Sequence, residues 1–234
     1  MPHLDSIVID AQDPARLAGF WAVALDAPVA YQGDDGTRLL LPEQFELFLD
    51  FVPVSERLER PHRLHLDLYG GAEHTEVARQ LTELGAAPVD IGQGQVPWVV
   101  LTDPDDYAFC VLPGQVEGID PGSIMAVTIE ADDKDAAFAF WREATGWLPA
   151  QEEYTLRHPS GAGLLLAFFD SVEPKRGKNP MHLDLRTGPE EDYDAVLRGL
   201  LDRGATLAEH DWGQLPWTVL IDPGGNECCL LRAD

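Results

Sequence analysis

The stretch His65-Leu66-Asp67-Leu68 returns 117 positions later as His182-Leu183-Asp184-Leu185. Four further matches keep the same order along the chain: Phe20-Trp21 with Phe140-Trp141, Pro97-Trp98 with Pro216-Trp217, Asp103-Pro104 with Asp222-Pro223, and Cys110 with Cys229. Their offsets are 119 or 120 residues, and small insertions or deletions in surface loops explain the drift. The chain is therefore a tandem duplication, which predicts two domains at 1–114 and 121–234 with a short linker at 115–120.

Each half divides again into two units with the same order of predicted elements. In the first unit we expect a strand at 4–10, a helix at 14–25 and strands near 28–32, 37–41 and 46–52. Asp13 is a good N-cap residue, Pro14 suits the first helical position, and apolar side chains then follow the spacing of one buried helix face. The second unit has predicted strands at 63–69, 87–91, 95–102 and 107–112, and further helices are expected at 74–84, 134–145 and 190–203, each ending at a glycine. Four such βαβββ units predict an α+β fold.

The composition is strongly acidic, since 41 Asp and Glu residues against 16 Lys and Arg give a formal charge of −25. Such a surface repels nucleic-acid phosphates and anionic lipid, so we expect neither partner, and it favours cationic small molecules. The start of the chain shows no basic segment followed by a long apolar one, and the longest apolar run, 164–169, is too short to span a bilayer. The three cysteines form no disulfide framework. Together these features predict a cytoplasmic protein.

The duplicated βαβββ unit resembles the vicinal oxygen chelate (VOC) superfamily, which includes glyoxalase I, extradiol dioxygenases and bleomycin-resistance proteins. The residues that carry the resemblance are Asp13 to Trp21, the His65 to Leu68 stretch, and Asp222 to Glu227. The chain is most similar to the tandem glyoxalase-like proteins of bacteria. The resemblance implies that two units pair to curl a mixed sheet into a half-open cup, with helices outside and the binding site on the inner face. We expect each half of the chain to build one such cup.

Strand alternation selects the side chains that line the cups. The leucines at 64, 66 and 68 share one face of their strand, which should pack on a helix, whereas His65 and Asp67 share the other. The same argument holds for His182 and Asp184 in the second half. We therefore expect two inward-facing His–Asp pairs. Each is either part of a functional site or a satisfied polar pair.

The resemblance also implies where a metal would bind, because metal-using relatives place one ligand on the first and one on the last strand of each unit. The first half offers Asp5 (or its neighbour Ser6), Asp50, His65 and Cys110, a set suited to Zn²⁺ or Fe²⁺. The second half offers Met125, Ala167, His182 and Cys229, so we expect it to be free of metal. The usual glutamate is missing from the last strand in both halves, although Glu227 is a substitute in the second half if the strand register is shifted. No cofactor is therefore the leading expectation, and a metal in the first half is the alternative.

Two tryptophans add a candidate ligand contact. Trp98 and Trp217 each follow a proline at the start of a predicted strand, where an indole can stack on a flat ligand or belong to the core.

Two functions of different class follow from these residues. In the first, the chain is a small-molecule-binding protein, such as a resistance or sequestering protein, with degraded metal sites. In the second, it is an enzyme, a lyase, isomerase or dioxygenase, with its active cup in the first half. There His65 acts as ligand or general base, Asp67 orients it, and Asp50 and Cys110 complete the site. The duplication allows a monomer, and pairing of sheet edges allows a homodimer.

Overall fold

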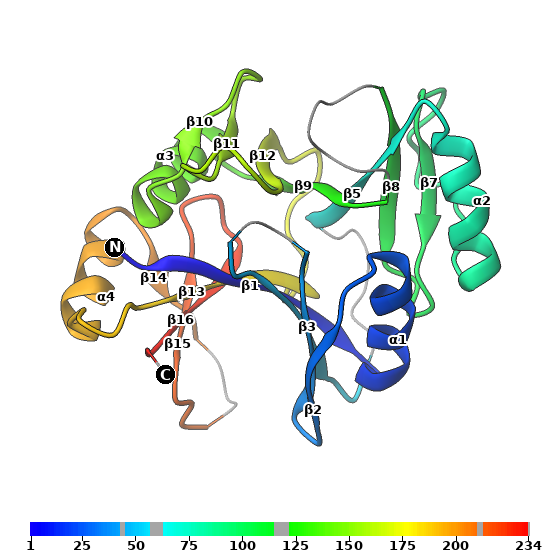
Figure 1. Cartoon of the computed structure of the whole chain (residues 1–234). Helices are drawn as coiled ribbons and strands as arrows, with labels where there is room; N and C mark the ends of the chain where they lie inside the picture. The colour runs from blue at the N-terminus through cyan, green and yellow to red at the C-terminus, as the bar shows by residue number, and fades with distance from the viewer. Residues whose placement is uncertain (43–44, 57–62, 115–121, 210–212, 234) are drawn as a thin grey trace.

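The computed structural model describes residues 1–234 except 43–44, 57–62, 115–121, 210–212 and 234 (Figure 1). Its four helices are α1 (Pro14–Ala24), α2 (His74–Leu84), α3 (Lys134–Thr145) and α4 (Tyr193–Asp202). None of the described helices combines the length and the apolar composition that crossing a bilayer requires.

The strands form two eight-stranded mixed sheets, which we call sheet A and sheet B. Sheet A runs in the order β14 (Thr206–Leu207), β15 (Thr218–Ile221), β16 (Glu227–Leu231), β13 (Met181–Arg186), β1 (His3–Ala11), β4 (Phe48–Pro53), β3 (Gly36–Leu40) and β2 (Val29–Gly33). Sheet B runs in the order β10 (Leu148–Pro149), β11 (Thr155–Arg157), β12 (Leu165–Asp170), β9 (Ile124–Ala131), β5 (Leu64–Gly71), β8 (Ala108–Pro113), β7 (Val99–Thr102) and β6 (Ala87–Pro88). The α+β class and the four βαβββ units are confirmed.

The units do not pair in the expected way. Strand β1 of the first unit pairs with β13 of the fourth, and β5 of the second unit pairs with β9 of the third, both antiparallel. Each half of the chain therefore contributes one unit to each sheet, and the expectation that each half curls into its own cup is wrong. The repeat identifies which units are alike, but it does not show which units share a sheet. The same repeat would be seen if the first unit paired with the second or with the fourth.

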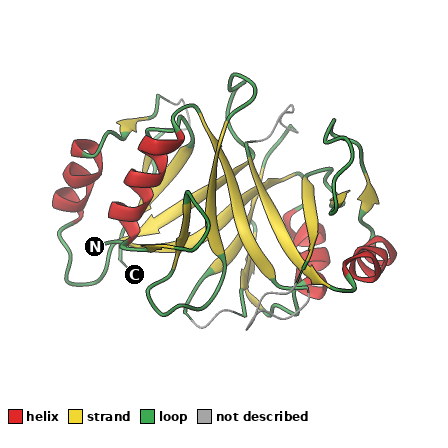
Figure 2. Ribbon diagram, turned by 90° about the horizontal axis from the view of Figure 1, so that it is seen from above, coloured by secondary structure: helices red, strands yellow, loops and turns green. Residues whose placement is uncertain are grey.

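The helices lie in two pairs at opposite ends of the molecule, α1 beside α2 and α3 beside α4 (Figure 2). Helix α1 begins as predicted, with Pro14 in its first turn and the Asp13 side chain accepting a hydrogen bond from Arg16 N. The bounds of α2 and α3 match the prediction, and α3 ends at Gly146 with a left-handed φ of 71°.

Other boundaries differ from the prediction. Helix α4 begins at Tyr193 because the carboxylate of Asp192 caps it, accepting hydrogen bonds from the backbone N–H groups at 194 and 195. The strand expected at 87–91 is only Ala87–Pro88, and the strand expected at 95–102 starts at Val99. Proline has no N–H for a sheet ladder: Pro88 is the last residue of β6, and Pro97 lies in the segment that is lost before β7.

Two buried tryptophans connect the sheets. Trp21 on α1, which covers sheet A, donates from Nε1 to Asp103 Oδ2 at 3.1 Å, in the turn between β7 and β8 of sheet B. Trp141 on α3, which covers sheet B, makes the equivalent bond of 2.8 Å to Asp222 Oδ2, in the turn between β15 and β16 of sheet A. The Trp and the Asp-Pro elements of the repeat thus hold the two sheets together within each half of the chain.

Candidate functional site

The leucines of both His-Leu-Asp-Leu stretches are buried in the hydrophobic core, as strand alternation predicted. The His and Asp residues occupy the opposite face of β5 and β13. Each of these faces carries a His–Asp–Cys group: His65, Asp67 and Cys110 in sheet B, and their repeat partners in sheet A. In each group, one nitrogen, one oxygen and one sulfur lie within 4.8 Å of one another.

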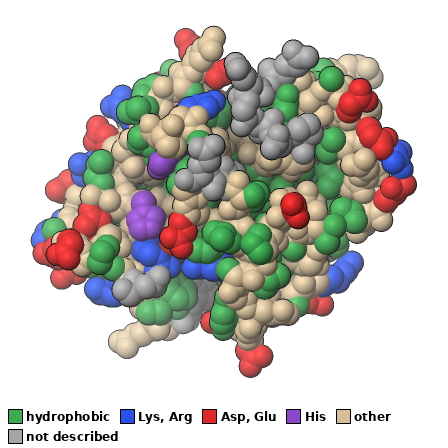
Figure 3. Space-filling model, viewed as in Figure 1, with side chains coloured by type: hydrophobic (Ala, Val, Ile, Leu, Met, Phe, Trp, Pro, Cys, Tyr) green, Lys and Arg blue, Asp and Glu red, His purple; other side chains and the backbone are tan. Residues whose placement is uncertain are grey.

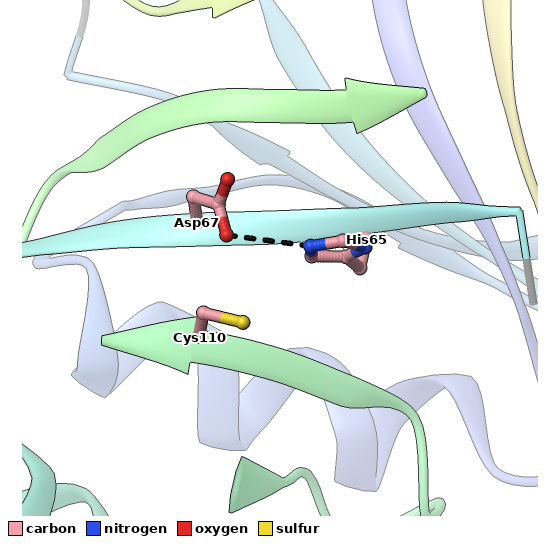
Figure 4. A group of neighbouring side chains, drawn as sticks. All are labelled: His65, Asp67 and Cys110. Atoms are coloured by element: carbon pink, nitrogen blue, oxygen red, sulfur yellow. Dashed lines mark ion pairs between the residues drawn. The ribbon is translucent and has the colours of Figure 1, made fainter. Parts of the chain in front are cut away.

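In sheet B, His65 and Asp67 extend from β5 and Cys110 from the neighbouring β8 (Figure 4). His65 Nε2 lies 3.4 Å from Asp67 Oδ1, and the histidine side chain is 27% exposed. The other carboxylate oxygen, Oδ2, accepts a hydrogen bond of 2.6 Å from the hydroxyl of Thr128. Thr128 lies directly opposite His65 in the ladder between β9 and β5. The Asp67 carboxylate is thus held in place while His65 stays accessible.

In sheet A, the equivalent group is more deeply buried and less satisfied. His182 Nε2 lies 3.3 Å from Asp184 Oδ1, and each side chain is only 10% exposed. Within the described part of the chain, His182 Nδ1, Asp184 Oδ1 and the nearby Ser6 Oγ have no hydrogen-bond partner. Ser6 lies opposite Asp184, and Val8 lies opposite His182. The valine has no hydroxyl to offer at the position that Thr128 occupies in sheet B.

The four donors expected in one metal site are divided between the two sheets. Asp5 and Asp50 lie in sheet A, on β1 and β4, whereas His65 and Cys110 lie in sheet B. The grouping of these four residues is therefore wrong, because it assumed that the first two units share a sheet. The residues that do share sheet A with Asp50 include His182.

Both aspartates of sheet A are engaged with arginines. Arg38 on β3 donates to both carboxylate oxygens of Asp50, from Nε at 2.7 Å and from Nη2 at 2.6 Å. The same Nη2 lies 3.4 Å from Asp5 Oδ2. Arg186 on β13 donates to both oxygens of Asp5 at 2.6 and 3.1 Å. Burial lowers the pKa of Arg38, but hydrogen bonding to Asp50 and the charges of Asp50, Asp5 and Asp184 outweigh it and raise that pKa. Burial raises the pKa of Asp50, against the opposing effect of Arg38.

The cysteines are neutral thiols in this environment. Burial raises the pKa of Cys110, and the Asp67 carboxylate raises it further. Burial and Asp184 do the same for Cys229, with Lys178 acting in the opposite direction. Cys228 is fully buried in the core on the other face of β16. None of the three is therefore an activated nucleophile.

The two candidate tryptophans stand apart from the core. Trp98 is 36% exposed and Trp217 39%, whereas Trp21 is 1% exposed. Trp98 lies two residues before Val100, the strand partner of Cys110, and Trp217 lies two residues before Val219, the strand partner of Cys229. The alternation of strand residues places each indole on the same side as the cysteine, where it is available to a ligand.

Sequence reasoning missed the residues that distinguish the two sheets. Thr128, Arg38 and Arg186 were not singled out, although alternation within their strands could have placed them on the faces of the His–Asp pairs. The two arginines affect the site by pairing with the carboxylates of Asp5 and Asp50. Arg186 can reach Asp5 only because the fourth unit pairs with the first, which the sequence did not reveal.

The two groups differ in how well they suit a divalent metal ion. In sheet B, His65, Asp67 and Cys110 offer three donors, which is the number of protein ligands at a typical catalytic zinc site, and no described lysine or arginine forms an ion pair with Asp67. These donors fit a metal. In sheet A, Asp50 is occupied by Arg38, whose charge also reaches Asp184. A second positive charge at that position opposes a divalent ion, so the sheet A donors do not fit one.

Comparison with known proteins agrees with this architecture. A sequence model of the glyoxalase-like domain matches residues 6–112 and again 126–231. The chain therefore belongs to the glyoxalase-like domain family, within the VOC superfamily, and carries two copies of the domain. No curated protein sequence matched.

Solved structures show the same fold at low sequence identity. Glyoxalase I from Zea mays superposes with a TM-score of 0.66 at 14% identity, covering 99% of this chain and 92% of that one. A putative dioxygenase from Bacillus subtilis superposes with a TM-score of 0.62 at 12% identity, covering 98% and 84%. At these identities the likeness defines the fold, and the chemistry has to be argued from the residues.

Proposed function

We propose that the chain binds a small molecule on the His182 face of sheet A. The observation that carries this proposal is the set of three buried polar atoms, Ser6 Oγ, His182 Nδ1 and Asp184 Oδ1. None of them makes a well-formed hydrogen bond to a described residue, although Asp184 Oδ1 lies 3.3 Å from His182 Nε2. A buried polar group without a hydrogen bond costs about 1–3 kcal/mol, so such groups in a native protein call for a partner. A ligand with hydrogen-bond donors and acceptors supplies it.

The surroundings of these atoms favour binding over metal chemistry. The carboxylates of Asp5 and Asp50 are already paired with Arg38 and Arg186, so neither carboxylate is free to bind a metal ion. The partly exposed Trp217 offers an apolar surface to a flat part of the ligand. A molecule with a planar apolar part and a polar end is the ligand class that this face suits. Sequestration of such a molecule, as in a resistance protein, is the corresponding role.

A thermal-shift screen of small molecules tests this proposal. Compounds that raise the midpoint of unfolding of the wild-type protein are measured again on His182→Ala and on its repeat counterpart, His65→Ala. We expect the shifts to disappear in His182→Ala and to persist in His65→Ala. Shifts that survive His182→Ala and are lost in His65→Ala would move the binding site to sheet B.

A second candidate function, a VOC-type enzyme, is favoured by the geometry of sheet B. His65, Asp67 and Cys110 would hold a Zn²⁺ or Fe²⁺ ion, which, when bound, polarises an oxygen of the substrate as a Lewis acid. As an alternative to ligating an ion, Asp67, fixed by Thr128, orients the imidazole, and the accessible His65 is then able to hold or move a proton.

Metal analysis of protein purified without a chelator or a histidine tag separates this candidate from simple binding. Close to one Zn or Fe per chain, lost in His65→Ala and kept in His182→Ala, supports the enzyme. A wild-type protein that takes up no metal from an excess of Zn²⁺ or Fe²⁺ rules it out.

A further inference from the structure

Sheet A has an arginine–carboxylate pair at a position where sheet B has neither residue. Asp50 lies opposite Val8, the strand partner of His182, and Arg38 lies opposite Asp50 on the next strand. In sheet B, Thr128 lies opposite His65, as Val8 lies opposite His182 in sheet A. Ala167 then takes the position of Asp50, and Thr155 takes the position of Arg38. The cation and the anion are present together in one sheet and absent together from the other. They are thus a matched pair.

The pair lies on the same face of sheet A as His182, because His182, Val8, Asp50 and Arg38 lie opposite one another on successive strands. Arg38 takes both oxygens of Asp50 and approaches Asp5, so its single guanidinium bridges two carboxylates from neighbouring strands. Its planar group also lies 4.4 Å from the centre of the Phe48 ring, which fixes its orientation. With Arg186 on Asp5, the two aspartates are neutralised without any bound ion.

We propose that Arg38 takes the place of a divalent metal ion in sheet A. The guanidinium supplies the positive charge that holds the carboxylates of this face together, and it keeps a metal out by electrostatic repulsion. Removal of Arg38 takes away the ion pair of Asp50 and leaves Asp5 paired with Arg186, on the face that also carries Asp184 and the imidazole of His182. Oxygen and nitrogen donors with net negative charge constitute a divalent cation site. This inference concerns the metal chemistry of the face and does not depend on the identity of the ligand.

Cobalt titration of an Arg38 variant tests the proposal, because Co²⁺ reports its coordination through its visible absorption. All measurements use the His65→Ala background, so that the sheet B group does not contribute. The parent His65→Ala protein should bind no Co²⁺ below millimolar concentration. Adding Arg38→Met, which keeps much of the apolar stem, should create one site and tighten binding by at least roughly a hundredfold. Asp50→Asn in addition should abolish that site.

Two controls keep the outcome decisive. Arg186→Met removes the same charge from the network but leaves Arg38 on Asp50, so it should give no comparable gain. Arg38→Lys keeps the positive charge and should also remain without metal. If Arg38→Met does not fold, as judged by circular dichroism, Arg38→Gln replaces it in the same titration. A parent protein that binds one Co²⁺ through Asp50, or a folded Arg38→Met or Arg38→Gln protein that gains no site, overturns the proposal.

Discussion

Val8 and His182 lie directly opposite each other in the antiparallel ladder between β1 and β13, so the first and last units of the chain share one sheet. In the other sheet, the position of Val8 is taken by Thr128, whose hydroxyl binds Asp67. The two His–Asp pairs therefore differ in this neighbour: a threonine hydroxyl binds the carboxylate in sheet B, and a valine occupies the equivalent position in sheet A. In Figure 3 the acidic side chains are spread over the visible surface, with basic ones among them.

Thr128→Val should lower the free energy of unfolding by about 1–2 kcal/mol. The valine keeps the shape of the side chain but removes the hydroxyl that donates a hydrogen bond to Asp67 Oδ2. Urea unfolding at neutral pH measures the difference. Thr128→Ser restores the hydroxyl and should recover most of the loss. Equal losses for the valine and serine variants would mean that packing of the methyl group, and not the hydrogen bond, accounts for the effect.

Trp21→Phe should cost about 1–3 kcal/mol, since it leaves the buried Asp103 without its indole donor. Trp141→Phe should cost a similar amount through Asp222. Both free energies of unfolding are obtained from chemical denaturation. A change below about 0.5 kcal/mol in both variants would contradict the role of these bonds in joining the sheets.

The carboxyl of Asp103 should make stability depend on pH. Burial raises its pKa from 3.8 to about 7, against the hydrogen bonds from the backbone of Tyr107, from Trp21 and from the backbone of Asp105. Folding therefore favours the protonated acid, so its stabilising contribution is full below pH 3.8 and is lost as the pH rises through about 7. Relative to Asp103→Asn, the wild type should lose up to about 4 kcal/mol of unfolding free energy between pH 4 and 8. A difference between the two proteins that does not change over this range would contradict the raised pKa.

Gly19→Ala should stabilise the protein by about 0.5–1 kcal/mol. Gly19 lies within α1, and a methyl group added there meets nothing within 4 Å, so the gain in helix propensity is not offset by a clash. Gly36→Ala is the matched opposite case. Its φ is +145°, and the added methyl would lie 2.4 Å from the carbonyl oxygen of Phe51, so this variant should be destabilised. Thermal unfolding of the two variants should show shifts of opposite sign.

Much of the fold could be predicted from the sequence because its signals are local. The N-cap at Asp13 and the glycines that follow α2 and α3 are short-range signals, and they define these helices well. Alternation also placed His65 and Asp67 on one face of their strand. The composition of each site was not predictable in this way, because Asp50 and His182 meet only through pairing of the first unit with the fourth. That pairing depends on long-range contacts between units that look alike in sequence.

The most direct test of the account is a calorimetric titration of one ligand from the screen into three proteins: wild type, His182→Ala and His65→Ala. We predict one binding event in the wild type, a loss of affinity of at least roughly tenfold in His182→Ala, and unchanged affinity in His65→Ala, because Ser6 Oγ, His182 Nδ1 and Asp184 Oδ1 lie in sheet A. Unchanged affinity in His182→Ala together with a clear loss in His65→Ala would contradict the assignment of the binding site to sheet A.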